Sequence, residues 1–163
     1  MRDTLRSKAL EIMTPADRIP TALIIADDFT GACDTGVQFA RAGRPASVRL
    51  ADPSGHPAGD GGSAVVTVYD TESRHAEPQV AAERVRRAVA HALPGAPNLV
   101  YKKIDSTLRG RITAEVAALR RELPGRTVVV APAFPAAGRT TVDGECLVDD
   151  LPVNRTEFAR DPL

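Results

Sequence analysis

The chain has 163 residues, of which 43% are hydrophobic and 26% are charged, and its 21 basic and 21 acidic side chains leave a formal net charge of zero. This length and composition are typical of one globular domain and exclude a disordered chain. The absence of a basic excess and of tryptophan argues against nucleic-acid binding, which depends on cationic surfaces and on base stacking.

The cysteines and the N-terminal residues indicate a cytoplasmic protein. Cys33 and Cys146 stand far apart and form no metal-ligand spacing, which is typical of reduced thiols. Charged residues interrupt the apolar ones over the first twenty positions, and no segment has the character of a signal peptide or a membrane span. We expect a flexible leader over residues 1–19, a folded domain over residues 20–163, and no metal site, membrane partner or nucleic-acid partner.

Short apolar runs alternate with helical stretches, a pattern typical of βαβ units and a mostly parallel sheet. The first predicted strand is Ala22–Ala26, an unbroken apolar run that favours burial on both faces. It stops abruptly at Asp27 and Asp28. A helix is predicted to follow, with Thr30 as its N-cap and Gly43 as the residue that ends it.

The same alternation continues along the chain. Further strands are predicted over residues 46–50, 64–69, 99–104 and 127–131, and helices from Pro78 and over residues 110–123. Pro, Gly and Asp are frequent between Pro132 and Pro152, which predicts a long loop carrying a small hairpin. The sequence therefore predicts a Rossmann-like α/β fold, with a mostly parallel sheet flanked by helices and a hairpin insertion near the C-terminus.

Acidic residues follow three of the predicted strands: Asp27 and Asp28 after the first, Asp70 after the third and Asp105 after the fourth. The carboxyl ends of parallel strands meet at one edge of a sheet, where ligand crevices form, so we expect these carboxylates to converge. Close carboxylates repel one another unless they meet a cation, a basic partner or hydroxyl groups. Each can instead serve as a turn former or a helix cap, an alternative that stays open above all for Asp70.

Basic residues near the same strand ends can supply the balancing charge: Arg74, Lys102, Lys103, Arg109 and Arg139. Carboxylates accept hydrogen bonds from sugar hydroxyls, and an arginine binds a carboxylate through two parallel hydrogen bonds. A carboxylate beside a hydroxyl can also accept its proton. Because side chains alternate along a strand, only one of the two adjacent lysines should reach the crevice. This mixture of charges predicts a site for a small hydroxylated acid.

Four motifs, taken together and in this order, resemble the four-carbon acid sugar kinase family, formerly a domain family of unknown function. They are Ala26-Asp-Asp-Phe-Thr-Gly-Ala32, Tyr101-Lys-Lys-Ile-Asp-Ser-Thr-Leu-Arg-Gly110, the segment from Pro132 to Gly144, and Thr156-Glu-Phe-Ala-Arg-Asp-Pro162. The resemblance covers residues 23–163.

The resemblance implies an N-terminal domain that binds the sugar acid and a C-terminal domain that binds ATP. The complete enzyme would use ATP and Mg²⁺ to phosphorylate the terminal hydroxyl of threonate, erythronate or 3-oxo-tetronate. Asp27 or Asp28 is implied to orient or deprotonate that hydroxyl. The residues expected to bind the acid are Thr30, Arg74, Lys102, Asp105, Ser106, Arg109 and Arg139.

The chain departs from the family pattern in its length, because it ends just past the fourth motif and contains no GxxxxGK[ST] nucleotide loop. Phosphoryl transfer requires groups that position ATP and Mg²⁺. We therefore expect the ATP-binding domain to be absent, ATP and Mg²⁺ not to bind tightly, and the chain to be inactive without a further domain or a second chain. An incompletely covered domain would also expose an apolar edge and favour a homo-oligomer.

Two other functions stay open at this stage. A Mg²⁺-dependent phosphohydrolase of the haloacid dehalogenase kind also has an acidic motif after its first strand, but its two aspartates are separated by one residue, whereas Asp27 and Asp28 are adjacent. A non-catalytic remnant or interaction module is the second alternative. The short length favours it, and the intact acidic and basic motif residues speak against it.

Overall fold

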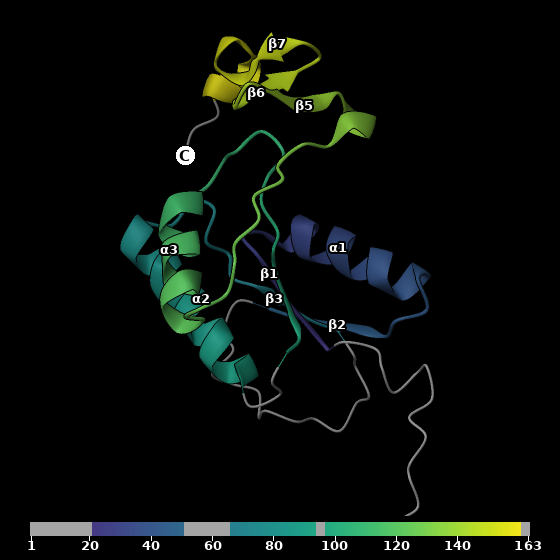
Figure 1. Ribbon diagram of the computed structural model, residues 1–163, viewed down its shortest axis with the longest axis vertical. Helices are drawn as coiled ribbons and strands as arrows, with labels where there is room; N and C mark the ends of the chain where they lie inside the picture. The colour runs from purple at the N-terminus through teal and green to yellow at the C-terminus, as the bar shows by residue number, and fades with distance from the viewer. Residues whose placement is uncertain (1–20, 51–65, 94–96, 161–163) are drawn as a thin grey trace, which may run out of the picture.

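The computed structural model describes residues 21–50, 66–93 and 97–160, and the larger of the two sheets within them is parallel throughout (Figure 1). Its strands are β1 (Ala22–Ala26), β2 (Ala46–Arg49), β3 (Val66–Asp70) and β4 (Leu99–Lys102), arranged in the order β2-β3-β1-β4. The predicted α/β fold with a parallel sheet is confirmed. The predicted leader over residues 1–19 lies outside the described residues.

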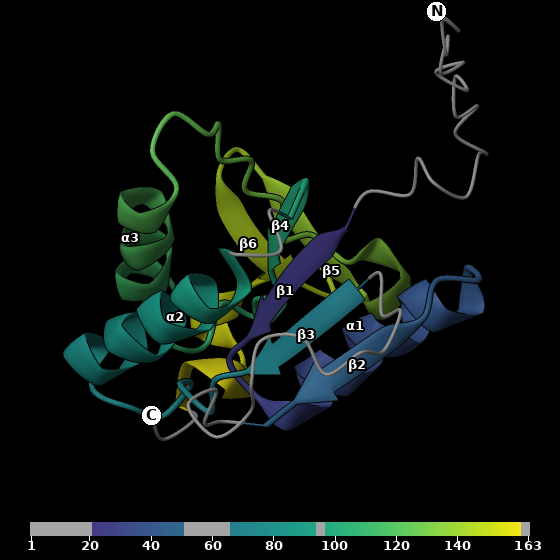
Figure 2. The ribbon, with the colours of Figure 1, turned by 90° about the horizontal axis from the view of Figure 1, so that it is seen from below.

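Strand β1 is the centre of the core, because it pairs with both β3 and β4 and all five of its residues are buried. Leu23 and Ile25 pack with residues of α2 (Pro78–Ala92) and α3 (Ile112–Glu122). Ile24 packs on the opposite face with Ala32 of α1 (Phe29–Arg41). Helices cover both faces of the sheet in this way, as Figure 2 shows, and the unbroken apolar sequence of β1 follows from that double burial.

Helix α1 begins earlier than the sequence predicts. Asp28, and not Thr30, is its N-cap: the backbone of Asp28 is extended, and its Oδ1 accepts the N–H of Gly31 at 2.9 Å. Thr30 is exposed in the first turn of the helix. A carboxylate directly after β1 therefore satisfies a backbone donor that would otherwise lack a partner.

The prediction of a strand over residues 127–131 is wrong. This segment forms no strand, and Val128, Val129 and Val130 are 46%, 84% and 67% exposed. Arg126 holds its start beside β4 by donating a hydrogen bond to the carbonyl of Pro97 at 3.0 Å. The apolar run is typical of a strand buried on both faces, but the described residues provide no layer that covers it.

The predicted hairpin near the C-terminus is confirmed. Strands β5 (Arg139–Val142), β6 (Glu145–Val148) and β7 (Leu151–Pro152) form a small antiparallel sheet, and the short 3₁₀ helices η5 (Val153–Arg155) and η6 (Glu157–Arg160) follow it. We call residues 134–160 the C-terminal unit. In Figure 1 it lies beyond the carboxyl ends of β1 and β3.

A buried polar network joins α3 to the loops that follow the sheet. The Nζ of Lys102 lies 3.1 Å from Oε2 of Glu115, and their side chains are 7% and 1% exposed. The other carboxylate oxygen of Glu115 accepts a hydrogen bond from Ser73 at 2.5 Å, and Ser73 lies 2.6 Å from the hydroxyl of Thr71. Thr71 in turn donates to the carbonyl of Ala26 at 2.8 Å. The network therefore fixes the chain that follows β3 against the end of β1.

We expect Glu115→Gln to lower the free energy of unfolding by roughly 2–4 kcal/mol, because it leaves the ammonium of Lys102 buried without a counter-charge. Urea unfolding followed by circular dichroism measures the change. Glu83→Gln on the exposed face of α2 is the control, and it should change little, because solvent screens the ion pairs of Glu83. The double variant Lys102→Met/Glu115→Leu should regain much of the loss. If the free energy of unfolding of Glu115→Gln equals that of the wild type, the pair is not structural.

Candidate functional site

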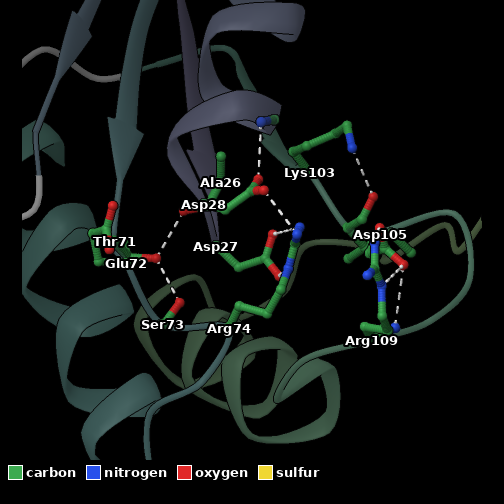
Figure 3. A network of polar contacts seen from close by, with 12 residues as sticks. Ala26, Asp27, Asp28, Thr71, Glu72, Ser73, Arg74, Lys103, Asp105 and Arg109 are labelled. Carbon is green, nitrogen blue, oxygen red and sulfur yellow. Dashed lines mark hydrogen bonds and ion pairs between the residues drawn. The ribbon is translucent and has the colours of Figure 1, made fainter. Parts of the chain in front are cut away.

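Charged side chains from three loops meet at the carboxyl ends of β1, β3 and β4 (Figure 3). Asp27 and Asp28 follow β1, Arg74 lies in the loop after β3, and Asp105 and Arg109 lie in the loop between β4 and α3. These five residues, which we call the crevice cluster, are among those that the sequence singled out. Their convergence follows from the parallel direction of the three strands.

Arg74 joins both adjacent carboxylates. Its Nε and Nη2 donate to the two oxygens of Asp27 at 2.9 and 3.1 Å, and its Nη1 lies 2.7 Å from Oδ2 of Asp28. Burial lowers the pKa of Arg74, but the hydrogen bond and charge of Asp27 and the charge of Asp28 outweigh burial and raise that pKa. The side chain of Asp27 is 1% exposed and that of Asp28 is 28% exposed. Asp28 is therefore the more accessible of the two predicted catalytic carboxylates.

Asp105 and Arg109 form a second paired group. Nε and Nη2 of Arg109 donate to the two oxygens of Asp105 at 3.0 and 2.9 Å, and the backbone N–H of Thr107 donates to Asp105 at 3.0 Å. Burial raises the pKa of Asp105, but the hydrogen bonds from Arg109 and Thr107 hold it well below its usual range. Asp105 therefore stays ionised and fixes the direction of the Arg109 guanidinium.

The two adjacent lysines point to different places, as strand alternation predicts. Lys102 lies in the core beside Glu115, so the structure does not bring this predicted binding residue to the crevice cluster. Lys103 is seen between Asp28 and Asp105 in Figure 3, where its Nζ donates to the carbonyl of Ile104 at 2.9 Å. The pattern of the sequence indicated that one lysine would face the crevice, but it did not say which.

Three predicted binding residues lie at the margin of the crevice cluster. Thr30 is exposed in the first turn of α1. The carbonyl of Ser106 accepts a weak hydrogen bond from Sγ of Cys146 at 3.5 Å. Arg139 begins β5, and its guanidinium lies 5.3 Å from the ring centre of Phe158. The ring of Phe158 is also 5.7 Å from the guanidinium of Arg109, so Arg139 reaches the cluster through an aromatic residue.

A pocket of about 280 Å³ opens beside the adjacent aspartates, a size that suits a small ligand. Its lining combines both signs of charge and consists of Asp27, Asp28, Glu72, Arg74, His75, Ala76 and Arg84. Glu72, His75 and Arg84 were not among the predicted site residues. The signal that could have found the first two is their position next to Arg74 in the loop after β3.

Asp70 is the last residue of β3, and its side chain supports the turn that follows the strand. It is 2% exposed, its Oδ1 accepts the backbone N–H of Glu72 at 2.9 Å, and its Oδ2 is buried without a hydrogen-bond partner among the described residues. Burial raises the pKa of Asp70 to about 6, although the N–H of Glu72 opposes the shift. The sequence left open whether Asp70 forms a turn or binds a ligand, and its contact with the N–H of Glu72 is that of a turn former.

Within the described residues, no group of three or more His, Cys, Asp or Glu side chains is arranged to hold a metal ion. In the same part of the chain, no helix has the length and apolar character needed to cross a membrane.

We expect Asp70→Asn to stabilise the protein increasingly as the pH rises. The pKa of Asp70 is raised from 3.8 to about 6 in the folded protein. The protonated side chain therefore contributes fully to the free energy of unfolding of the wild type below pH 4, and this contribution is lost as the pH rises through 6. The variant does not ionise, so its advantage in free energy of unfolding should grow by about 2 kcal/mol between pH 4 and pH 7.5. Urea unfolding at several pH values measures this, with the exposed Asp34→Asn as control. A pH-independent difference would contradict the raised pKa.

Comparison with protein families gives a match to the model described as the sugar-binding N-terminal domain, over residues 22–163. The chain is 48% identical to a D-threonate kinase from Salmonella typhimurium, with 86% of this chain and 32% of that protein covered. It is 43% identical to a D-erythronate kinase from Heliobacterium modesticaldum, over 86% of this chain and 32% of that protein. A 3-oxo-tetronate kinase from Methylobacterium radiotolerans is 31% identical, with 85% and 33% covered.

Solved structures agree with these matches. A protein of the family DUF1537 from Bordetella bronchiseptica, solved as a domain-swapped dimer with bound citrate, superposes with a TM-score of 0.82 at 39% identity and covers 88% of this chain and 36% of that one. A DUF1537 protein from Haemophilus influenzae gives a TM-score of 0.76 at 27% identity, with 86% and 34% covered. The chain spans about a third of the length of the curated relatives it matches. It therefore belongs to the four-carbon acid sugar kinase family, and it corresponds to the sugar-binding N-terminal domain of that family.

Proposed function

We propose that this chain is the substrate-binding part of an ATP-dependent kinase that phosphorylates four-carbon acid sugars such as threonate, erythronate or 3-oxo-tetronate. The observation that carries the proposal is the contact of Arg74 with both Asp27 and Asp28 at the wall of a pocket of about 280 Å³. The relatives that share this part of the chain are kinases of those three acids.

The pocket contains both kinds of group that a hydroxylated acid requires. The carboxylates of Asp28 and Glu72 can accept hydrogen bonds from hydroxyl groups, and the guanidinium groups of Arg74 and Arg84 can donate to a carboxylate. The site residues proposed from the sequence remain candidates except Lys102, which lies in the core beside Glu115. Lys103 takes its place, because Figure 3 shows it between Asp28 and Asp105.

Asp28 is the carboxylate that we propose to orient the attacking hydroxyl and accept its proton. Both oxygens of Asp27 already accept hydrogen bonds from Arg74, and its side chain is 1% exposed, so Asp27 is better suited to hold Arg74 in place. Asp28 is more exposed and lines the same pocket. A proton acceptor has to reach the hydroxyl that it deprotonates, which favours the accessible carboxylate.

ATP and Mg²⁺ belong, in this proposal, to a part of the enzyme outside this chain. They supply the phosphoryl group and neutralise the charge that develops during transfer. The curated relatives are about three times as long as this chain. We therefore propose that residues 20–163 form the acid-binding domain of a cytoplasmic enzyme and depend on a nucleotide-binding domain or a second chain for activity.

The Mg²⁺-dependent phosphohydrolase is not favoured, because such an enzyme attacks phosphate with a free carboxylate of its first acidic motif. Arg74 occupies both oxygens of Asp27, and Asp28 is adjacent to Asp27, whereas the two aspartates of such an enzyme are separated by one residue. A second alternative is a non-catalytic module. The two can be told apart by mixing this chain with the separately produced C-terminal part of a related kinase. If the chain is the substrate-binding part of a kinase, the mixture should phosphorylate a four-carbon acid, and if it is a non-catalytic module, it should not.

We expect Arg109→Ala to weaken the binding of a four-carbon acid by about tenfold, because it removes a guanidinium from the crevice cluster and leaves Asp105 without its main partner. Calorimetric titration of the chain with threonate, erythronate and 3-oxo-tetronate, without nucleotide, measures the affinity. Arg86→Ala on the exposed face of α2 is the matched control and should bind as the wild type does. A folded wild-type chain that binds none of the acids would refute the proposed function.

We also propose that the chain associates with a second copy of itself through Val128, Val129 and Val130 and the neighbouring free edge of β4. A run of exposed β-branched residues beside a strand edge that is unpaired among the described residues favours pairing between chains. The relative from Bordetella bronchiseptica, which shares this fold, is a domain-swapped dimer.

We expect Val129→Lys to shift the chain toward the monomer, because a charged side chain at the most exposed position of the run opposes pairing. Sedimentation velocity over a range of concentrations measures the association. Val37→Lys serves as the control. Val37 is an exposed valine on α1 that is not part of the run, so its substitution should leave the association unchanged. A wild type that stays monomeric at all concentrations would contradict the proposal.

A further inference from the structure

The aromatic ring of Phe158 lies within cation–π distance of two guanidinium groups that come from separate parts of the chain. The guanidinium carbon of Arg139 is 5.3 Å and that of Arg109 is 5.7 Å from the ring centre. Arg109 lies in the loop after β4, Arg139 begins β5, and Phe158 lies in η6. A cation within about 6 Å of the centre of an aromatic ring is attracted to its face.

The charges around this ring are not balanced. Arg109 is neutralised by Asp105, which accepts two of its hydrogen bonds. Arg139 has no ion pair among the described residues: its Nη1 donates to the carbonyl of Ala137, and its Nε is buried without a hydrogen-bond partner. Among the described residues, no carboxylate therefore neutralises the guanidinium of Arg139 beside the ring. A buried N–H of a charged group without an acceptor is costly, and an oxyanion would satisfy it.

Phe158 and its two arginines lie next to the crevice cluster, because Arg109 belongs to both groups. The charge of Asp105 contributes to the raised pKa of Arg74, so the pair of Asp105 and Arg109 lies close enough to Arg74 to influence it. The carbonyl of Ser106 accepts the Sγ–H of Cys146 in β6, which places the C-terminal unit against the same loop. The guanidinium of Arg139 is thus held at the border of the candidate substrate site.

We propose that Phe158 is a positioning residue, whose ring holds Arg139 and Arg109 together as an oxyanion subsite at the edge of the crevice. The subsite binds the carboxylate of the sugar acid, an assignment that rests on the proposed function. Two guanidinium groups repel each other, and the ring face offsets part of that repulsion before the ligand arrives. The C-terminal unit thereby contributes to acid recognition.

The first test needs no ligand. NMR spectra of the side-chain Nε–Hε groups of Arg109 and Arg139 are recorded for the wild type, Phe158→Leu and Phe158→Tyr. Loss of the ring should shift both resonances in Phe158→Leu, whereas Phe158→Tyr should keep them near their wild-type positions. Phe134→Leu is the control, because the backbone of Phe134 pairs with Arg139 but its ring makes no cation–π contact with any residue that the structure describes. Unshifted arginine resonances in folded Phe158→Leu would overturn the positioning role.

The second test measures binding by calorimetry, with threonate, inorganic phosphate and neutral threitol as ligands. Phe158→Leu and Arg139→Gln should each weaken threonate binding five- to tenfold, and Phe158→Tyr should bind within twofold of the wild type. Equal affinity of wild type and Phe158→Leu for threonate would overturn the subsite, as would equal weakening of threonate and threitol, because the second compound has no carboxylate. If phosphate binds more tightly than threonate and shows the same dependence on Phe158, the subsite takes a phosphoryl group, and the assignment to the carboxylate is overturned.

The two tests separate this inference from the proposed function. A wild type that binds no sugar acid would refute the proposed function and the carboxylate assignment, while the arginine resonances would still decide whether Phe158 positions the two guanidinium groups. Normal threonate binding that is insensitive to Phe158 and Arg139 would refute the subsite alone.

Discussion

Two adjacent carboxylates at the exit of a buried strand repel each other, and the guanidinium of Arg74 is the group that offsets this repulsion. It binds both oxygens of Asp27 and one oxygen of Asp28. Without it, the chain could not bring two charges together directly after the five buried residues of β1. The two aspartates nevertheless differ in their surroundings: both line the pocket, but the side chain of Asp27 is buried and that of Asp28 is partly exposed. A single arginine therefore contacts both carboxylates, and the proposed function assigns proton acceptance to Asp28 because it is the more exposed of the two.

The position of Arg74 depends in turn on residues that never face the pocket. Ser73, its neighbour in sequence, donates a hydrogen bond to Glu115, and Glu115 is paired with Lys102 in the core. Breaking such a buried pair is costly, so the loop after β3 has one well-defined position relative to β1. Helix α3 thereby contributes to the crevice although none of its side chains lines the pocket. The polar core and the candidate site form one connected arrangement.

The C-terminal unit contributes to the candidate site in a different way, because it contacts the crevice cluster through a weak hydrogen bond and a cation–π interaction. A thiol hydrogen bond from Cys146 and the aromatic face of Phe158 connect it to the loop that carries Arg109. Each contact is worth little alone, and together they place Arg139 at the border of the site. The exposed valines of residues 128–130 lie in the segment that leads into this unit. This segment lies between α3 and the C-terminal unit.

The sequence by itself determined the parallel sheet, the convergence of Asp27, Asp28 and Asp105, and the presence of balancing arginines. These follow from apolar periodicity and from the shared direction of the strands, which are local properties. Tertiary structure alone decided that Lys102 is buried and Lys103 is not, because alternation fixes that neighbours point apart but not which one points inward. It also decided that residues 127–131 form no strand, since a strand requires a paired edge and a covering layer as well as an apolar sequence. The contact of Phe158 with two arginines joins three segments that are distant in the chain, and no spacing in the sequence encodes it.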